Sequence, residues 1–203
     1  MQLDQREKGF SFSKEGPLDM RMDPSDELTA REIVNEWPEE KLGEILRDFG
    51  EETRWRRAAQ IIVEARDKGP IETTKQLADL LAGKLGRGFK KKLHPATLIF
   101  QGLRICVNRE LESIQNALPK ALEVLSFGGR MGVMSFHRLE DRIAKSIFKE
   151  GATVPAQNKY KEFVQKPTLR LLSKKPLVAS IDEVRANPRA RSAKLRFAEK
   201  MVH

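Results

Sequence analysis

Cysteine is almost absent from this chain: Cys106 is the only one among 203 residues, alongside three histidines. A single cysteine cannot form a disulfide within the chain, which is typical of proteins in a reducing compartment. So few cysteines and histidines also cannot supply ordinary zinc-ligand spacing, and no metal site is predicted. Cys106 lies in the apolar stretch 103–107, where we expect an inert thiol in the core.

Long apolar runs are absent as well. No segment reaches the ~18 apolar residues that a membrane-spanning helix needs, and the N-terminus lacks the apolar core of a secretory signal. The sequence therefore predicts a cytoplasmic protein without a membrane segment. It also contains no Walker loop, no G-x-S-x-G motif and no G-x-G loop after an N-terminal strand. The motifs of P-loop nucleotidases and serine hydrolases are thus missing.

Positive charge is what the chain has in excess. Its net charge is +9, from 38 Lys and Arg against 29 Asp and Glu, and this favours a polyanionic partner. Two segments, 84–94 and 185–196, each hold five Lys or Arg residues and no acid. Such runs favour contact with nucleic-acid phosphates, although a solvated basic face is the alternative that charge alone leaves open.

Helical patterns dominate the first half of the chain. Residues 1–28 show no sustained period and are rich in Gly and Pro, which indicates a loop segment. Four helices are predicted next: from a capping box at Thr29 to Trp37, from Pro38 to Gly50, over 51–68, and from a second capping box at Thr73 to Leu85. Residues 29–93 are therefore predicted to form a compact helical unit.

The remaining residues, 94–203, mix helices and strands. Helices are predicted from His94-Pro95 to Ile114, over 118–125 with Gly128-Gly129 as a cap, and over 143–149. Strands are predicted at 130–136, 169–172 and 195–197, with one helical turn at 181–185. The order of helix, buried strand and polar loop is typical of α/β proteins, in which functional groups lie at the carboxyl end of a strand.

The polar segment from Ser135 to Arg142 follows the predicted strand 130–136. It offers a hydroxyl, an imidazole, two carboxylates and two guanidinium groups within eight residues. His137 is a candidate base, and Glu140 or Asp141 is a candidate acceptor of hydrogen bonds from an amine. A structural alternative stays open, in which the two acids cap the following helix.

A second polar segment, from Gly16 to Pro24, sets Asp19 and Asp23 four residues apart with Arg21 between them. In a loop this arrangement can position a base edge or a ribose. Equally, it can be an Arg–Asp network that only holds the loop. The nearby Phe10 and Phe12 either stack on a nucleobase or anchor the loop to the core.

These segments belong to a longer set of strings that resembles one family. The set includes Gln2-Leu3-Asp4, Gly9-Phe10-Ser11-Phe12, His94-Pro95-Ala96-Thr97, Gly128-Gly129-Arg130 and Asn187 to Arg196. Over essentially the whole chain the sequence resembles the bacterial small-subunit ribosomal RNA cytosine-N4 methyltransferases, the MraW or RsmH family. The resemblance implies transfer of a methyl group from S-adenosylmethionine to a cytidine amine in the decoding region of the small-subunit RNA.

The resemblance also implies a fold and a site. The expected class is α/β: the C-terminal part of a Rossmann-like, S-adenosylmethionine-dependent methyltransferase sheet with an inserted all-helical domain. The implied division is a methyltransferase loop segment at 1–28, the inserted helical domain at 29–93 and the C-terminal part of the methyltransferase domain at 94–203. The site residues that follow are Ser135, His137 and Glu140 facing the target amine, Asp19 and Asp23 holding the base or its loop, Gln2 contacting the cofactor, and Lys90, Lys91, Lys92, Arg189 and Arg191 on RNA phosphates.

The sequence also departs from the family pattern. An upstream half with the Gly-rich cofactor loop is not present ahead of Gln2, Phe127 replaces a usual proline, and Arg138 replaces a usual serine. Without that half, the innermost strand is expected to expose an unpaired edge through which the chain self-associates. An RNA-binding remnant without catalysis, or an inactive fragment, is therefore the alternative to an active methyltransferase acting on the small ribosomal subunit.

Overall fold

The computed structural model describes residues 6–86, 94–153 and 167–201. The chain divides into two compact units, Met1–Glu110 and Leu111–His203. This division differs from the three segments expected above, but compactness does not reveal which segment is an insertion. The expected domain boundaries therefore stay a prediction. No helix in the described ranges is both long and apolar enough to cross a membrane.

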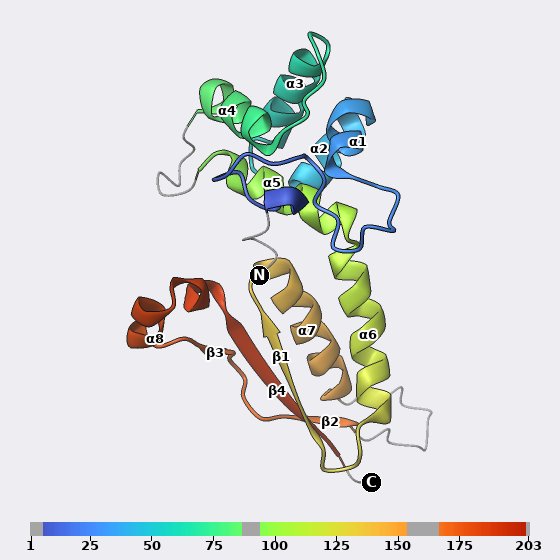
Figure 1. Cartoon of the computed structure of the whole chain (residues 1–203). Coiled ribbons are helices and arrows are strands. Elements are labelled where there is room, and N and C mark those ends of the chain that lie inside the picture. Colours follow the sequence, from blue (N-terminus) through green and yellow to red (C-terminus); the bar gives the residue numbers. More distant parts are fainter. Residues whose placement is uncertain (1–5, 87–93, 154–166, 202–203) are drawn as a thin grey trace. The chain divides into compact units, whose positions relative to one another are not determined.

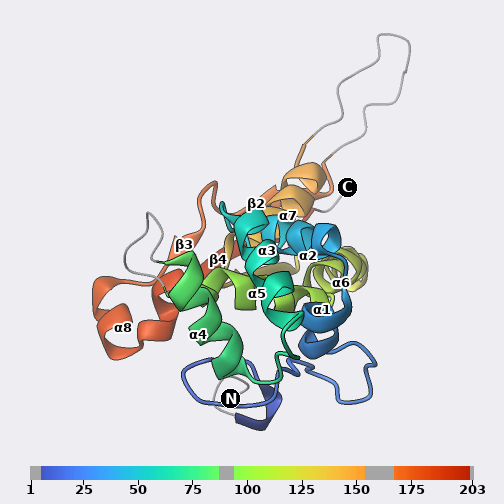
Figure 2. The same cartoon turned by 90° about the horizontal axis from the view of Figure 1, so that it is seen from above.

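The first unit is helical, with α1 (Ala30–Glu36), α2 (Glu39–Asp48), α3 (Trp55–Arg66), α4 (Thr74–Leu85) and α5 (Ala96–Val107) (Figures 1 and 2). A short 3-10 turn, η2 (Arg6–Lys8), lies in the segment before α1. Both predicted capping boxes are present: the Thr29 and Thr73 side chains accept hydrogen bonds from the backbone N–H groups of Glu32 and Gln76. The predicted helical unit is confirmed at the level of its elements.

Apolar residues from all five helices form one core in this unit, including the fully buried Ile33, Leu46, Ile62 and Leu77. The loop before α1 adds Phe10, Leu18 and Met20 to it. Phe12 packs against this core, with its ring 4.7 Å from that of His94 and 4.9 Å from that of Phe100. The anchoring interpretation of Phe10 and Phe12 thus fits their packing.

Two predicted helix boundaries in this half are wrong. The third helix begins at Trp55 and not near residue 51, because Glu51 adopts a positive φ of 53° that a helix does not allow. The helix predicted to run from His94 to Ile114 ends at Val107, and α6 (Glu110–Val124) begins after a turn in which Arg109 has a φ of 46°. Pro119 lies inside α6, which therefore covers both predicted helical stretches from residue 110 onward.

The second unit contains a small antiparallel sheet and helices. Its strands are β1 (Arg130–Ser135), β2 (Leu169–Leu171), β3 (Leu177–Val178) and β4 (Lys194–Lys200). β4 pairs with each of the other three, and β1 pairs with β4 alone among the described strands. The positions of the predicted strands are confirmed, but β1 is not the buried strand that was expected, because only Ser135 of its six residues is buried. β3 was not predicted because it has only two residues. Gly128-Gly129 bonds to Lys200 in the turn before β1 and does not cap α6.

α7 (Arg138–Gly151) covers one face of this sheet (Figure 1). Phe148 and Ala144 of α7 pack with Leu118 of α6, Leu169 of β2 and Ala198 of β4 in a small core. After β3 the chain forms α8 (Ile181–Ala186) and the 3-10 turn η3 (Pro188–Ser192). The structure is thus mixed α/β and mostly helical. Its sheet is consistent with the expected end of a methyltransferase sheet, which stays a proposal.

Candidate functional site

Ser135, His137 and Glu140 lie within six residues of one another along the chain, where β1 ends and α7 begins. Ser135 is the last residue of β1 and is 3% exposed, with its hydroxyl 3.4 Å from the Lys194 carbonyl oxygen. His137 is the N-cap of α7, and Glu140 lies in its first turn. The end of β1 and the first turn of α7 therefore carry all three residues, and their joint role as a site stays a prediction.

Glu140 is held by the backbone in front of α7. Its Oε2 accepts hydrogen bonds from the N–H groups of Phe136 at 2.7 Å and His137 at 3.2 Å. Burial by itself raises the pKa of Glu140, but the His137 side chain and the two N–H groups outweigh it, and the pKa is lowered. The capping alternative accounts for Oε2, whereas Oε1 lies 3.3 Å from His137 Nε2.

The imidazole of His137 is the unusual group at this strand end. Its side chain is 11% exposed, and neither ring nitrogen has an aligned hydrogen bond to any residue that the structure describes. Buried polar atoms nearly always have a partner, so such an exception calls for an explanation. A ring nitrogen without a protein partner can accept a hydrogen bond from an amine or donate one to an oxygen.

Asp141, the other acid of this segment, is occupied by β4. Its Oδ1 accepts from Arg196 Nε at 2.7 Å and its Oδ2 from Arg196 Nη2 at 3.2 Å and Lys194 Nζ at 3.3 Å. The hydrogen bonds from Arg196 lower the pKa of Asp141 against the opposing effect of burial. Asp141 therefore ties α7 to the sheet, and its alternative role as an acceptor for an amine does not fit these contacts.

In the first unit, Arg21 binds both oxygens of Asp19. The two side-chain contacts, Nε to Oδ1 and Nη2 to Oδ2, are both 2.8 Å long. Arg21 Nη1 also donates to the carbonyl oxygens of Pro24 and Asp26. The hydrogen bonds that the Arg21 side chain donates to Asp19 are the main cause of its lowered pKa, and they outweigh the opposing effect of burial. The loop-locking interpretation thus accounts for the Asp19 carboxylate.

Asp23 lies in the same loop but has a different environment. It accepts hydrogen bonds from the backbone N–H of Ser25 at 2.9 Å and from the Ser25 hydroxyl at 2.8 Å, and the former is the main cause of its lowered pKa. Its side chain is exposed. Asp23 is therefore the more accessible of the two predicted loop carboxylates.

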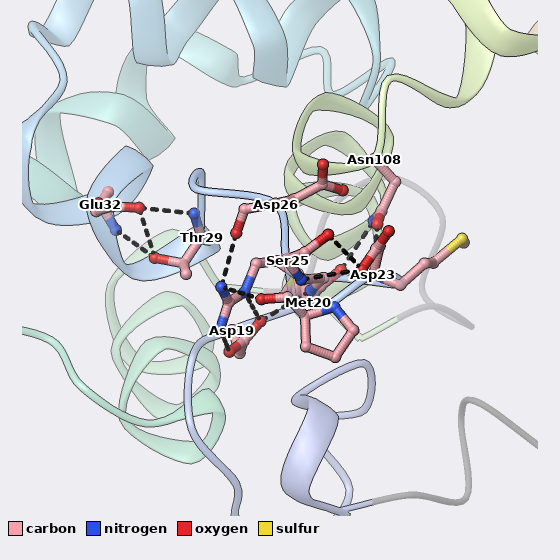
Figure 3. A network of polar contacts seen from close by, with 11 residues as sticks. Asp19, Met20, Asp23, Ser25, Asp26, Thr29, Glu32 and Asn108 are labelled. Carbon is pink, nitrogen blue, oxygen red and sulfur yellow. Dashed lines mark hydrogen bonds and ion pairs between the residues drawn. The ribbon is translucent and has the colours of Figure 1, made fainter.

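Asn108 holds this loop from a distant point in the sequence, as Figure 3 shows. Its amide donates to the Met20 carbonyl oxygen at 2.8 Å and accepts from the Met22 N–H at 2.7 Å. Asn108 was not among the predicted site residues, although Val107-Asn108 is a sharp change from apolar to polar. A polar amide directly after an apolar helix was the signal that could have identified it.

Of the other predicted contact residues, the structure describes only some. Arg189 and Arg191 are exposed on η3. Gln2, Lys90, Lys91 and Lys92 lie outside the described residues. Ser135, His137 and Glu140 belong to the second unit, whereas Asp19 and Asp23 belong to the first. The structure therefore brings together two separate groups of candidates, each within its own unit.

Comparison with known proteins decides the family. A model of the MraW methylase family matches residues 1–201. The chain belongs to this family. It is 49% identical over 206 residues to a protein of Protochlamydia amoebophila named ribosomal RNA small subunit methyltransferase H, a match covering 98% of this chain and 65% of that relative. Proteins of the same name from Heliobacterium modesticaldum and Geobacter sulfurreducens are each 48% identical over 204 residues.

The MraW-family match has a defined extent. It covers 98% of this chain and 65% of the Heliobacterium relative, and 98% and 66% for the Geobacter one. The chain thus spans about 65% of the length of the curated relatives it matches. Membership of the family is shown, and the resemblance seen in the sequence is confirmed.

Proposed function

We propose that this chain takes part in methyl transfer from S-adenosylmethionine to the N4 amine of a cytidine in the decoding region of small-subunit ribosomal RNA. The family match over residues 1–201, together with the name shared by the relatives, carries the proposal. The small ribosomal subunit is then its partner and the cytoplasm its location. S-adenosylmethionine would supply the methyl group.

The described residues fit the acceptor side of this reaction. The target base must leave its stack so that its amine can approach the methyl donor. His137 Nδ1, which has no hydrogen-bond partner among the described residues, can then accept a hydrogen bond from the amine and fix its direction. Alignment of the reacting atoms supplies much of the rate of such a transfer.

In this proposal Ser135 and Glu140 face the target amine together with His137. Glu140 Oε1, 3.3 Å from His137 Nε2, orients the ring. Asp19 and Asp23 hold the base or its loop, and Arg189 and Arg191 contact RNA phosphates together with Lys90, Lys91 and Lys92. Gln2 contacts the cofactor by resemblance alone.

A methyl-transfer assay with variants of His137 tests the proposal. The chain is incubated with small-subunit ribosomal RNA and tritiated S-adenosylmethionine, and the RNA is digested and searched for N4-methylcytidine. A parallel chimera adds the part of the Protochlamydia relative that lies outside the match. We expect His137→Phe to lower the chimera's rate by about 100-fold. The matched control, Phe136→Leu at an exposed neighbour, should keep it.

Two further variants separate the roles at this strand end. Replacement of His137 by Gln retains an acceptor and should preserve more activity than Phe. A Glu140→Ala chain that methylates normally would remove Glu140 from the scheme. No N4-methylcytidine from either chain or chimera would overturn the proposed activity and favour RNA binding without catalysis, which the excess of positive charge independently supports.

We also propose self-association through β1. Its only neighbour among the described strands is β4, so one row of its backbone groups faces away from the sheet. Such an edge is a template for pairing with another chain. Met134 on β1 is 56% exposed, and Met134→Lys should convert a concentration-dependent dimer into a monomer in sedimentation experiments. The control, Leu177→Lys on β3 at 55% exposure, should leave it dimeric. A monomeric wild type would overturn this idea.

A further inference from the structure

Four cationic side chains form a stripe along α7. Arg138, Arg142, Lys145 and Lys149 follow one another at intervals of four, three and four residues, and all four are exposed. At 3.6 residues per turn this spacing confines them to an arc of about 60° on the helix surface. Ala144 and Phe148 point the other way, into the small core. We call this row of four residues the α7 stripe.

The stripe is unfavourable for the helix on its own. Like charges three or four residues apart repel one another, whereas a solvated helix face usually alternates their signs. Among the described residues, Arg142, Lys145 and Lys149 form no ion pair with a carboxylate, and the nearby Asp141 is taken by Arg196 and Lys194. A row of exposed charges of one sign is expected where a negatively charged partner binds.

A pocket beside α7 extends the stripe to other elements. It has a volume of about 200 Å³, and Lys145 and Lys149 share its wall with Lys174, from the turn after β2. Phe148 and Leu171 contribute apolar surface, and none of the described residues that line it carries a carboxylate. Three lysines thus converge from two places in the chain, which periodicity in α7 alone does not explain.

The charge of the chain is concentrated in the same unit. Residues 111–203 contain 18 Lys and Arg against 9 Asp and Glu, whereas residues 1–110 contain 20 of each. The second unit therefore carries the whole net charge of +9. Its potential draws a polyanion towards the unit that holds the α7 stripe.

We propose that the α7 stripe, with Lys174, binds the phosphate backbone of RNA. The inference rests on the proposed function for its choice of polyanion, and it assigns a surface beyond segments 84–94 and 185–196. A membrane surface fits less well, because a helix that lies on lipid exposes an apolar face, and the apolar face of α7 is buried. These contacts position the strand and read no sequence.

The test compares two double variants of equal charge. Lys145→Gln with Lys149→Gln removes two charges from the stripe, and Lys120→Gln with Lys41→Gln removes two exposed charges from α6 and α2. Binding of a fluorescein-labelled single-stranded RNA is measured by anisotropy over a series of salt concentrations, without S-adenosylmethionine. Thermal melts followed by circular dichroism check that both variants fold.

We expect the stripe variant to bind about tenfold more weakly at low salt, with a slope of log affinity against log salt reduced by about 1.4, or 0.7 for each lost phosphate contact. The control variant should stay close to wild type in both its affinity at low salt and its salt slope. Equal effects of the two variants would overturn the inference, and so would binding to phosphatidylserine vesicles without binding to RNA.

The outcome is separable from that of the proposed function. Stripe-dependent RNA binding by a chain and chimera that form no N4-methylcytidine would overturn the methyl-transfer proposal and support the surface. If N4-methylcytidine is formed and the stripe variant binds RNA as well as the control does, the methyl-transfer proposal is supported and the proposed surface is overturned. Lys174→Gln should weaken binding further when added to the stripe variant, because Lys174 lies on the same pocket.

Discussion

Asn108 holds Met20 in a strained conformation. The Asn108 amide donates to the Met20 carbonyl oxygen at 2.8 Å, while Met20 is fully buried with a φ of 65°. A non-glycine residue in this region costs of order 1 kcal/mol and persists only where its surroundings impose it. This contact therefore helps to fix the loop that carries Asp19 and Asp23.

Replacement of Asn108 by Asp should loosen that loop. The carboxylate can still accept from Met22 but cannot donate to the Met20 carbonyl, which leaves a partly buried acceptor unpaired. We expect a loss of about 1–3 kcal/mol in the free energy of unfolding, measured by urea denaturation, and faster proteolysis within residues 16–26. Asn116→Asp, an exposed change of equal charge on α6, is the control. Equal stability of the two variants would contradict the bracing role of Asn108.

Two glycine substitutions should have opposite effects on the first unit. A Cβ on Gly50 would lie 2.6 Å from the carbonyl oxygens of both Leu46 and Leu98, so the backbone must move. Gly50→Ala should therefore destabilise the unit by about 1–3 kcal/mol. Gly83, exposed in the interior of α4, has open space around it. Gly83→Ala should stabilise by up to about 1 kcal/mol. Differential scanning calorimetry of both variants checks the signs.

The Asp141 contact with Arg196 should make the second unit sensitive to acid and to mutation. Asp141→Asn leaves a largely buried guanidinium without its counter-charge and should cost about 3 kcal/mol. The exposed pair of Asp182 and Arg185 is the control, and Asp182→Asn should change stability by less than about 0.5 kcal/mol. Thermal melting of the two variants provides the comparison.

The pH dependence of this contact has a definite sign. The pKa of Asp141 is lowered in the folded chain, mainly by hydrogen bonds from Arg196, so its stabilising effect is complete above the unfolded Asp pKa of about 3.9. The effect is lost as pH falls from there through the folded pKa. The stability gap between wild type and Asp141→Asn should thus be constant near neutral pH and close in acid. A gap that widens in acid would contradict this linkage.

Cys106 should be slow to react with thiol reagents. Burial raises its pKa to about 11, so only about one thiol in a thousand is ionised at pH 8, and the thiolate is the reactive form. Alkylation by iodoacetamide, followed by mass spectrometry, should be slow in buffer and fast in denaturant. Equally fast alkylation in buffer would show that the thiol is accessible and ionised in the folded chain.

Local signals in the sequence predicted most elements of the fold. Thr29 and Thr73 identify two helix starts because capping depends on residues within one turn. The break between α5 and α6 was missed because the turn at Asn108 and Arg109 contains no glycine or proline. The turn is instead held by a hydrogen bond from Asn108 to Met20, which lies 88 residues away in the sequence. β3 was missed because two exposed residues, Leu177 and Val178, are a strand only through pairing with β4.

The candidate site was predictable in part for similar reasons. Ser135, His137 and Glu140 were proposed because they lie close together in the sequence at the end of one predicted strand and match the family's pattern. The partners of Asp141 were not, since Lys194 and Arg196 lie more than 50 residues further along the chain and approach only when β4 pairs with β1. The spacing of its residues in the sequence is enough to reveal the α7 stripe. The proximity of Lys174 to the stripe depends on the fold of the turn after β2.

The order of the strands governs when the second unit can form. β4 follows β1, β2 and β3 in the sequence, yet each described pairing of the sheet includes it. During synthesis the three earlier strands therefore emerge before any of these pairings can form. Asp141 likewise cannot bind Lys194 and Arg196 until β4 has emerged. A premature stop codon anywhere before Lys194 would remove all of these pairings at once, however few residues it deletes, whereas the helices of the first unit precede it and can already be folded.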